Sequence, residues 1–134
     1  MDKGTTFGGS GGALALARPP VQTEDELESV KKYVLLGVVM RVLDHDIRSI
    51  GASAIKLPRL YESMLRGVQD RVLLDQAALR KRFKEKGIKL LEERRGTDGV
   101  DVDYVCRGYR HTFRMLWSHV KAESERVLKR YFQA

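Results

Sequence analysis

The sequence predicts an α+β fold that is mainly α, with three long helices and one antiparallel β-hairpin between the second and the third helix. Two observations carry this prediction. Apolar residues recur at helical spacing over residues 24–50, 58–86 and 109–132, whereas they alternate with polar residues between positions 88 and 106. The order of elements is therefore helix, helix, hairpin, helix.

Composition favours one soluble globular domain. The chain has 134 residues, of which 43% are hydrophobic and 32% charged, and disorder by composition would require far fewer apolar side chains. Residues 1–22 are the exception, because glycines surround Ser10 and two prolines follow. We predict a flexible tail over 1–22, partly similar to an engineered linker, and a single domain over 23–134.

The first helix begins with a clear capping signal. Thr23 supplies a hydroxyl N-cap, and Glu26 stands at the capping-box spacing. Apolar residues then cover most of the circumference of the helix, which is typical of a helix at the centre of its fold or one held between its own domain and a second copy. We therefore expect a homodimer through this helix.

The second helix is bounded by a proline and a glycine. Pro58 suits the first turn because its fixed φ is helical and its missing N–H costs nothing there. Gly87 is a good C-terminal residue, and Lys84 in the last turn complements the helix dipole. Together these residues predict a helix over 58–86.

The hairpin and the third helix follow from the next two changes of period. An Asp-Gly turn signal separates the two alternating runs, with Arg94 and Arg95 before it and Asp101 and Asp103 after it, so that opposite charges can pair across the strands. From Tyr109 onward, helical spacing predicts a third helix with an aromatic-rich core stripe.

Positive charge is the main functional signal. The formal net charge is +7, and the excess is concentrated in the second and third predicted helices. Arg110 and Arg114 would be one helical turn apart and project from one face. The expected binding surface comprises Arg80, Lys81, Arg82, Lys84, Arg94, Arg95, Arg107, Arg110 and Arg114. It suits either an acidic protein partner or nucleic acid: a contiguous basic face favours nucleic acid, whereas dispersed charges beside exposed apolar residues favour a protein.

We expect no catalytic, cofactor or metal site. Asp44, His45 and Asp46 point in directions about 100° apart on a helix and do not converge alone. His111 and His119 lack a recognisable nucleophile motif, and they are more typical of ordinary polar residues. Cys106, the single cysteine, is expected to be a packed, inert thiol.

The expected location is the cytoplasm. A single cysteine cannot form an internal disulfide framework, which fits a reducing compartment. The longest apolar run, Tyr33 to Met40, falls far short of the roughly 20 residues that span a bilayer, so no membrane segment is predicted.

Four segments resemble a known group of proteins: Val-Leu-Asp-His-Asp-Ile at residues 42–47, Leu57-Pro58 with Tyr61, Gly87-Ile88-Lys89, and Tyr-Val-Cys-Arg-Gly-Tyr at residues 104–109. The chain resembles, over about residues 27–132, short uncharacterised proteins of Bacillus-like bacteria and their mobile elements. The resemblance transfers no functional residue, and it implies an intracellular bacterial accessory or regulatory protein. The expectation is a non-enzymatic regulatory or adaptor protein, and the alternative is a nucleic-acid-binding regulator.

Overall fold

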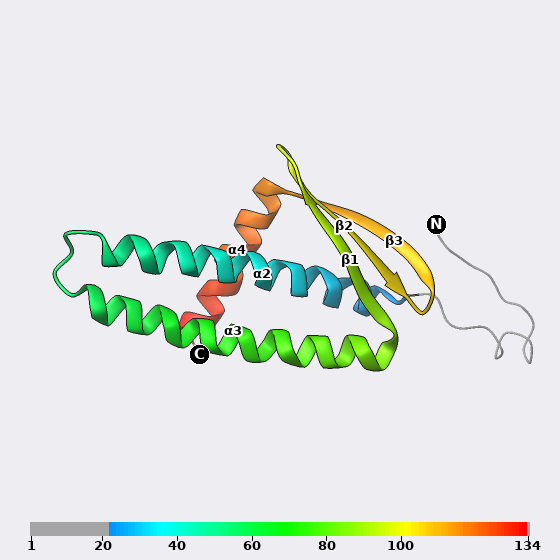
Figure 1. The fold of residues 1–134 in the computed structure, drawn as a ribbon, viewed down its shortest axis with the longest axis horizontal. Coiled ribbons are helices and arrows are strands. Elements are labelled where there is room, and N and C mark those ends of the chain that lie inside the picture. The colour runs from blue at the N-terminus through cyan, green and yellow to red at the C-terminus, as the bar shows by residue number, and fades with distance from the viewer. Residues whose placement is uncertain (1–21, 134) are drawn as a thin grey trace, which may run out of the picture.

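The computed structural model describes residues 22–133 and is α+β, mainly helical (Figure 1). Two long helices are followed by a three-stranded antiparallel sheet and a final helix. Their bounds are α2 (Glu24–Gly51), α3 (Pro58–Lys86), β1 (Ile88–Arg95), β2 (Gly99–Cys106), β3 (Tyr109–Leu116) and α4 (Trp117–Gln133). The predicted tail, including its linker-like glycines, lies outside the described residues except for Gln22.

Helix α2 begins at the predicted cap and runs through the centre of the fold. The Glu26 N–H donates to Thr23 Oγ1 at 3.1 Å, and Glu26 Oε1 accepts from the Thr23 N–H at 2.9 Å, which confirms the capping box. Val30, Leu36 and Val39 are completely buried. This central position accounts for the apolar circumference of the helix, and a homodimer through it stays a prediction.

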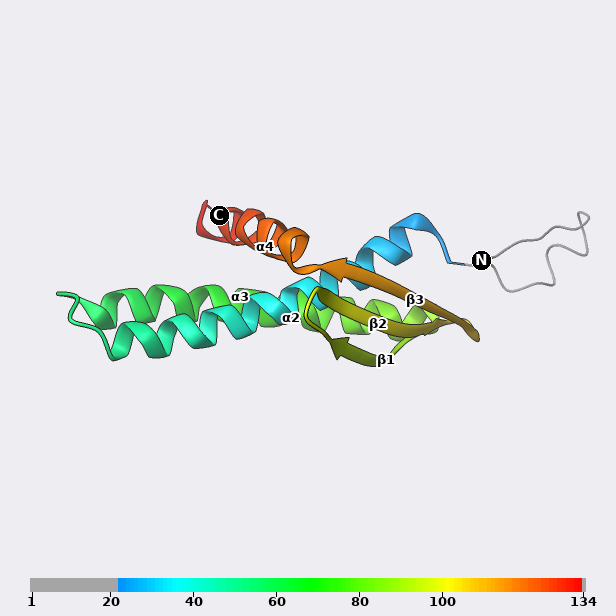
Figure 2. The same cartoon turned by 90° about the horizontal axis from the view of Figure 1, so that it is seen from above.

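Helices α2 and α3 form a long hairpin, and α4 crosses it on one side (Figures 1 and 2). The inner face of the sheet completes the core: Val100, Val102 and Tyr104 on β2 are buried in the same cluster as the apolar residues of α2. The core therefore draws on all three helices and the sheet.

The predicted hairpin is confirmed as β1 and β2, but the start of the predicted third helix is wrong. Residues Tyr109–Leu116 form strand β3, which pairs antiparallel with β2 from Cys106↔Tyr109 to Gly99↔Leu116, and helix α4 begins only at Trp117. As a strand, this segment hydrogen-bonds to β2 along its whole length, and Met115 is buried in the core.

Candidate functional site

A groove lies where α3 ends and β1 begins. The left-handed conformation of Gly87 (φ 72°) ends the helix and turns the chain back, so β1 starts beside the last turns of α3 (Figure 1). The groove has a volume of about 820 Å³, and we call it the α3–β1 groove. It is lined by Tyr33, Arg80, Lys81, Phe83, Lys84, Gly87, Ile88, Lys89 and Leu90.

The floor of the groove is apolar and fixed by the core. Phe83 and Ile88 are buried, and Tyr33 meets Phe83 edge to face with ring centroids 5.5 Å apart. Arg80 Nη1 donates to the Tyr33 hydroxyl at 3.2 Å, and its guanidinium lies 6.0 Å from the centre of the Tyr33 ring. The side chains of the floor are thus held in place before any ligand binds.

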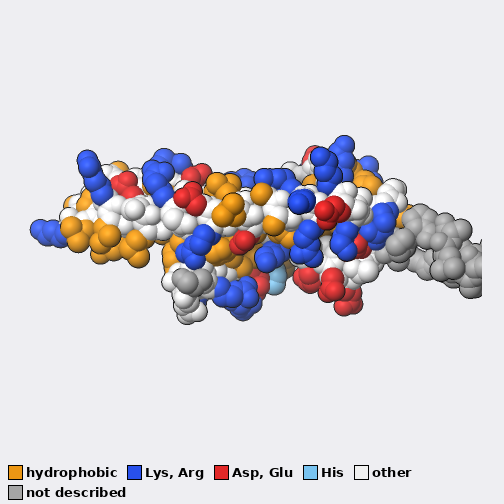
Figure 3. Space-filling model, turned by 90° about the horizontal axis from the view of Figure 1, so that it is seen from below, with side chains coloured by type: hydrophobic (Ala, Val, Ile, Leu, Met, Phe, Trp, Pro, Cys, Tyr) orange, Lys and Arg blue, Asp and Glu red, His pale blue; other side chains and the backbone are white. Residues whose placement is uncertain are grey.

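The rim of the groove is uniformly positive. Four of its lining residues are cations, namely Arg80, Lys81, Lys84 and Lys89, and none is a carboxylate. Figure 3 shows lysine and arginine side chains along the whole of this face, with several close together where α3 finishes and acidic side chains beside them. One sign of charge around a low-dielectric floor concentrates anions and speeds their association.

A second hollow of about 550 Å³ continues along β1 and shares Leu90 with the groove. It is lined by Arg41, Leu90, Leu91, Glu92, Glu93 and Arg95, so its charges are mixed. Burial and the nearby Arg95 lower the pKa of Arg41 from its usual value. Uniform positive charge is therefore confined to the end of β1 next to α3.

The outer face of the sheet gathers Arg94, Arg110 and Arg114, but around aspartates. Arg94 donates to both carboxylate oxygens of Asp103, at 2.6 and 3.1 Å, and Arg110 lies 3.4 Å from the same carboxylate. The ion pair between Arg94 and Asp103 confirms the prediction of charge pairing across the hairpin. It also holds the pKa of Asp103 well below its usual range, with Thr112 as a further donor at 2.9 Å.

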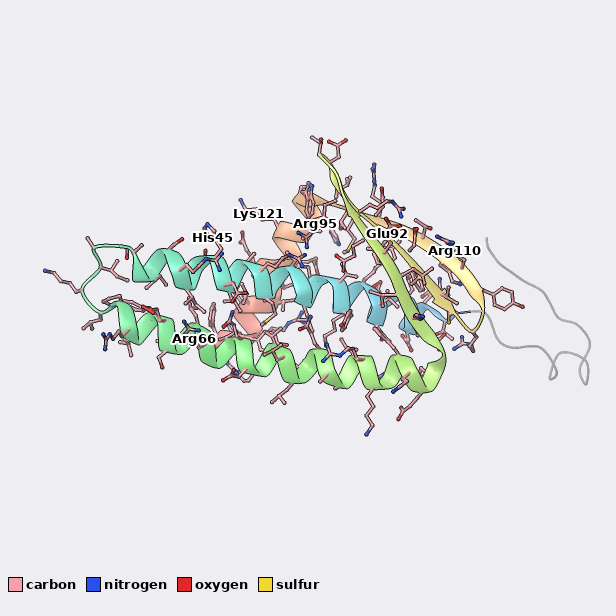
Figure 4. The ribbon with its side chains drawn as sticks, in the orientation of Figure 1. His45, Arg66, Glu92, Arg95, Arg110 and Lys121 are labelled. Carbon is pink, nitrogen blue, oxygen red and sulfur yellow. The ribbon has the colours of Figure 1, made fainter. Side chains whose placement is uncertain are left out.

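Arg110 and Arg114 belong to a strand and not to a helix, as corrected above. They still share one face, because side chains four residues apart also coincide in a strand. Arg114 Nε donates to Asp101 at 2.9 Å. Figure 4 labels Arg110 near the start of β3 and Arg95 at the opposite end of the sheet, on β1. The expected basic surface is thus not one continuous face.

The remaining predicted site residues, Arg82 and Arg107, lie elsewhere. Arg82 lines a separate pocket together with Asp25 and Glu26. Arg107 points to Glu26, with Nη2 2.7 Å from Oε1 and Nη1 2.8 Å from Oε2, and it also donates to the Lys86 carbonyl at 3.0 Å. Arg107 therefore ties the ends of α2 and α3 to the turn between β2 and β3.

The ion pair between Arg107 and Glu26 predicts a specific dependence of stability on pH. The hydrogen bonds from Arg107 lower the pKa of Glu26 to about 2, although burial opposes them. A lowered folded-state pKa stabilises the protein above the ordinary carboxyl pKa, and that stabilisation is lost as pH falls toward the folded value. We expect the free energy difference between the wild type and Glu26→Gln to be constant above about pH 5 and to shrink between about pH 4.5 and 2. Urea unfolding of both proteins across this range checks it; a difference that grows on acidification would contradict it.

Cys106 is completely buried, as predicted for a packed thiol. Burial raises its pKa, and its Sγ lies 3.9 Å from Glu26 Oε1. The thiol is therefore held in its unreactive protonated form at neutral pH.

The histidines and acidic residues considered as metal or acid–base groups lie apart. Asp44 accepts a hydrogen bond from Gln69 at 2.6 Å, whereas His45 is exposed and contacts Asp46. His111 stacks on Tyr104, and His119 lies on α4. Within residues 22–133, no group of three or more His, Cys, Asp or Glu side chains has a geometry that holds a metal ion. In the same range, none of the helices combines the length and apolar character needed to cross a bilayer.

Two residues that line the groove, Tyr33 and Lys89, are not part of the binding surface that the sequence predicts. In the sequence, Tyr33 belongs to an apolar run and Lys89 is an alternating polar residue of a strand, so neither stands out as a binding residue. The signal available for Lys89 was its position two residues after the helix-ending Gly87, which places it beside the last turn of α3.

The geometry defines a small α+β protein in which a helical hairpin carries a three-stranded sheet and a basic groove opens between them. The family model described as YhjD protein matches residues 21–134, and the chain belongs to the YhjD family. Comparison with curated proteins and with solved structures found no significant match.

Proposed function

We propose that this protein is a small non-enzymatic regulatory or adaptor protein of the bacterial cytoplasm, and that it binds an acidic protein partner through the α3–β1 groove. One observation carries the proposal: four cations surround an apolar floor, with no carboxylate among the lining residues. A groove of this kind suits a chain segment that carries both acidic and apolar side chains.

The charges elsewhere favour a protein partner over nucleic acid. Arg94, Arg110 and Arg114 are already bound to Asp101 and Asp103, so their charge is largely compensated within the sheet. Nucleic-acid binding would gain from a continuous basic face that neutralises successive phosphates. The α3–β1 groove, in contrast, is short and has hydrophobic side chains at its base.

A nucleic-acid-binding regulator is the second candidate. It is favoured by the outer face of the sheet, where Arg94, Arg110 and Arg114 come together and where the aspartates could be displaced by phosphates. Its signature would be binding to random-sequence duplex that falls steeply with salt and depends on Arg110 and Arg114.

Charge reversal in the groove tests the leading proposal. We expect the double variant Lys81→Glu and Lys84→Glu to bind a labelled peptide of alternating glutamate and valine at least about thirtyfold more weakly than the wild type, because two favourable charge pairs become repulsive. Fluorescence anisotropy measures the affinity of both proteins at matched salt.

The matched control makes the same change of charge outside the groove. Lys121 and Lys129 are exposed on α4, and Lys121→Glu with Lys129→Glu should retain nearly the wild-type affinity. Equal weakening by the two double variants would mean that only the net charge matters, and would count against the groove. A labelled DNA duplex in the same titration distinguishes the second candidate.

A further inference from the structure

Strand β1 has one open edge, and this edge borders the α3–β1 groove. The sheet order is β1-β2-β3, so β1 pairs with β2 on one side, and no strand within residues 22–133 pairs with its other side. An open edge presents backbone donors and acceptors that a further strand can use.

One backbone hydrogen bond determines which backbone groups of β1 face outward. At one end of the β1–β2 hairpin the Arg107 N–H donates to the Gly87 carbonyl at 2.8 Å, so Gly87 and Arg107 form a hydrogen-bonded pair. Bonded and non-bonded pairs alternate along an antiparallel ladder. The pairs Ile88↔Cys106 and Leu90↔Tyr104 are therefore non-bonded, and the N–H and C=O of Ile88 and Leu90 point away from β2.

These outward-facing groups lie at the positive part of the groove. Ile88 and Leu90 line the groove, with Lys89 between them and Lys81 and Lys84 on the opposite wall. A strand added here would receive backbone hydrogen bonds from β1 and would lie within reach of the cations. Its alternate side chains would face the apolar floor.

A bulge limits how far such a strand can extend. The register of β1 against β2 shifts between Leu90 and Glu92, with Leu91 as the extra residue. Bulges bend an edge and end regular pairing. Glu92 and Glu93 follow at once, and their charges repel an acidic chain. The usable edge is therefore Ile88–Leu90.

We propose that the partner's acidic segment binds in extended form, as a short strand added to the open edge of β1 at Ile88–Leu90. This inference rests on the proposed function and specifies its binding mode. The apolar side chains of the segment pack against the floor of the groove. Its carboxylates pair with the cations of the rim, which are Arg80, Lys81, Lys84 and Lys89.

Amide hydrogen exchange followed by NMR tests this binding mode on the wild-type protein. The probe is a synthetic peptide of alternating glutamate and valine, about eight residues long, which is a typical strand length; a lysine–valine peptide is the control. At saturation with the acidic peptide, we expect exchange of the Leu90 and Ile88 amides to slow by at least about tenfold. The Lys89 amide, which already lies in a bonded pair with Val105, should change little.

The possible results distinguish a failure of strand addition alone from a failure of the proposed function. Binding of the acidic peptide without slower exchange at Ile88 and Leu90 would overturn strand addition and leave the acidic-partner groove standing. No binding of the acidic peptide, or equal binding of the lysine–valine peptide, would overturn the proposed function and strand addition together.

A pair of proline variants gives a second readout. Leu90→Pro removes an outward N–H without removing a bond to β2, and we expect it to weaken binding of the acidic peptide at least about tenfold. Glu93→Pro removes an outward N–H on the far side of the bulge together with a charge that repels the peptide, and it should bind at least as tightly as the wild type. Thermal unfolding by circular dichroism verifies that both variants fold. Wild-type affinity in a folded Leu90→Pro variant would overturn strand addition.

Discussion

Replacing Arg107 by alanine is expected to lower the free energy of unfolding by about 3 kcal/mol, because it leaves the carboxylate of Glu26 buried without its cation. Only 8% of the Glu26 side chain and 20% of the Arg107 side chain are exposed. The backbone at position 107 has a positive φ of 50°. Alanine and arginine both carry a Cβ, so this φ costs them about the same, and the loss of stability reports the removed side chain. Urea unfolding at neutral pH measures it.

The double variant Arg107→Ala with Glu26→Gln is the control. It removes both charges, and we expect it to be more stable than Arg107→Ala alone, because the buried carboxylate is no longer ionised. A loss below about 1 kcal/mol for Arg107→Ala, or no recovery in the double variant, would contradict the assigned role of the ion pair.

Gly99→Ala is expected to destabilise the protein by about 3 kcal/mol, through a clash inside the sheet. A Cβ at this position would lie 2.2 Å from the Met115 carbonyl oxygen and 3.0 Å from the Leu116 Cα, and both atoms belong to the backbone of β3. Backbone atoms in a paired strand cannot move aside cheaply, so the start of β2 would have to shift. Urea unfolding of the variant measures the loss.

Gly96→Ala provides the comparison within the same turn. A Cβ there would lie 3.8 Å from the Gly99 carbonyl oxygen, which is ordinary contact, and the expected change is below about 1 kcal/mol. Similar stabilities for the two alanine variants would mean that β2 and β3 do not approach each other as closely as described.

Local signals were sufficient for the two long helices. The capping box at Thr23, Pro58 at the start of α3 and Gly87 at its end are all short-range features, and they set helix boundaries within a residue of those observed. The alternating residues of β1 and β2 and their turn were equally local. These parts of the fold follow from propensities and caps alone.

Strand β3 was not predictable in the same way, because its residues fit two periods. Tyr109, Phe113 and Leu116 are spaced as on a helix, yet Tyr109, His111 and Phe113 also alternate as in a strand. The choice depends on partners outside the segment itself: the backbone of β2, which lies just before it in the sequence, and the aspartates of β2 that accept hydrogen bonds from Arg110 and Arg114. Tertiary pairing of this kind overrides local periodicity.

The α3–β1 groove could not be predicted from local sequence signals for a related reason. The sequence identified Arg80, Lys81 and Lys84 as basic residues of one helix, but the open wall opposite them is made by β1. Sequence alone also assigned Arg94, Arg110 and Arg114 to the same surface. It predicted pairing of Arg94 with the aspartates of β2, but it placed Arg110 and Arg114 on a helix and so could not show that the same aspartates compensate them. Which cations are available to a partner is decided by tertiary structure.

Chemical-shift mapping is the most direct test of the acidic-partner groove. Amide shifts of the isotope-labelled protein are followed by NMR while the glutamate–valine peptide is added. The account predicts that the largest changes cluster at Lys81, Lys84 and Ile88–Leu90, with little change at Arg110 and Arg114. Changes centred on the outer face of the sheet, or none at all at saturating peptide, would contradict it.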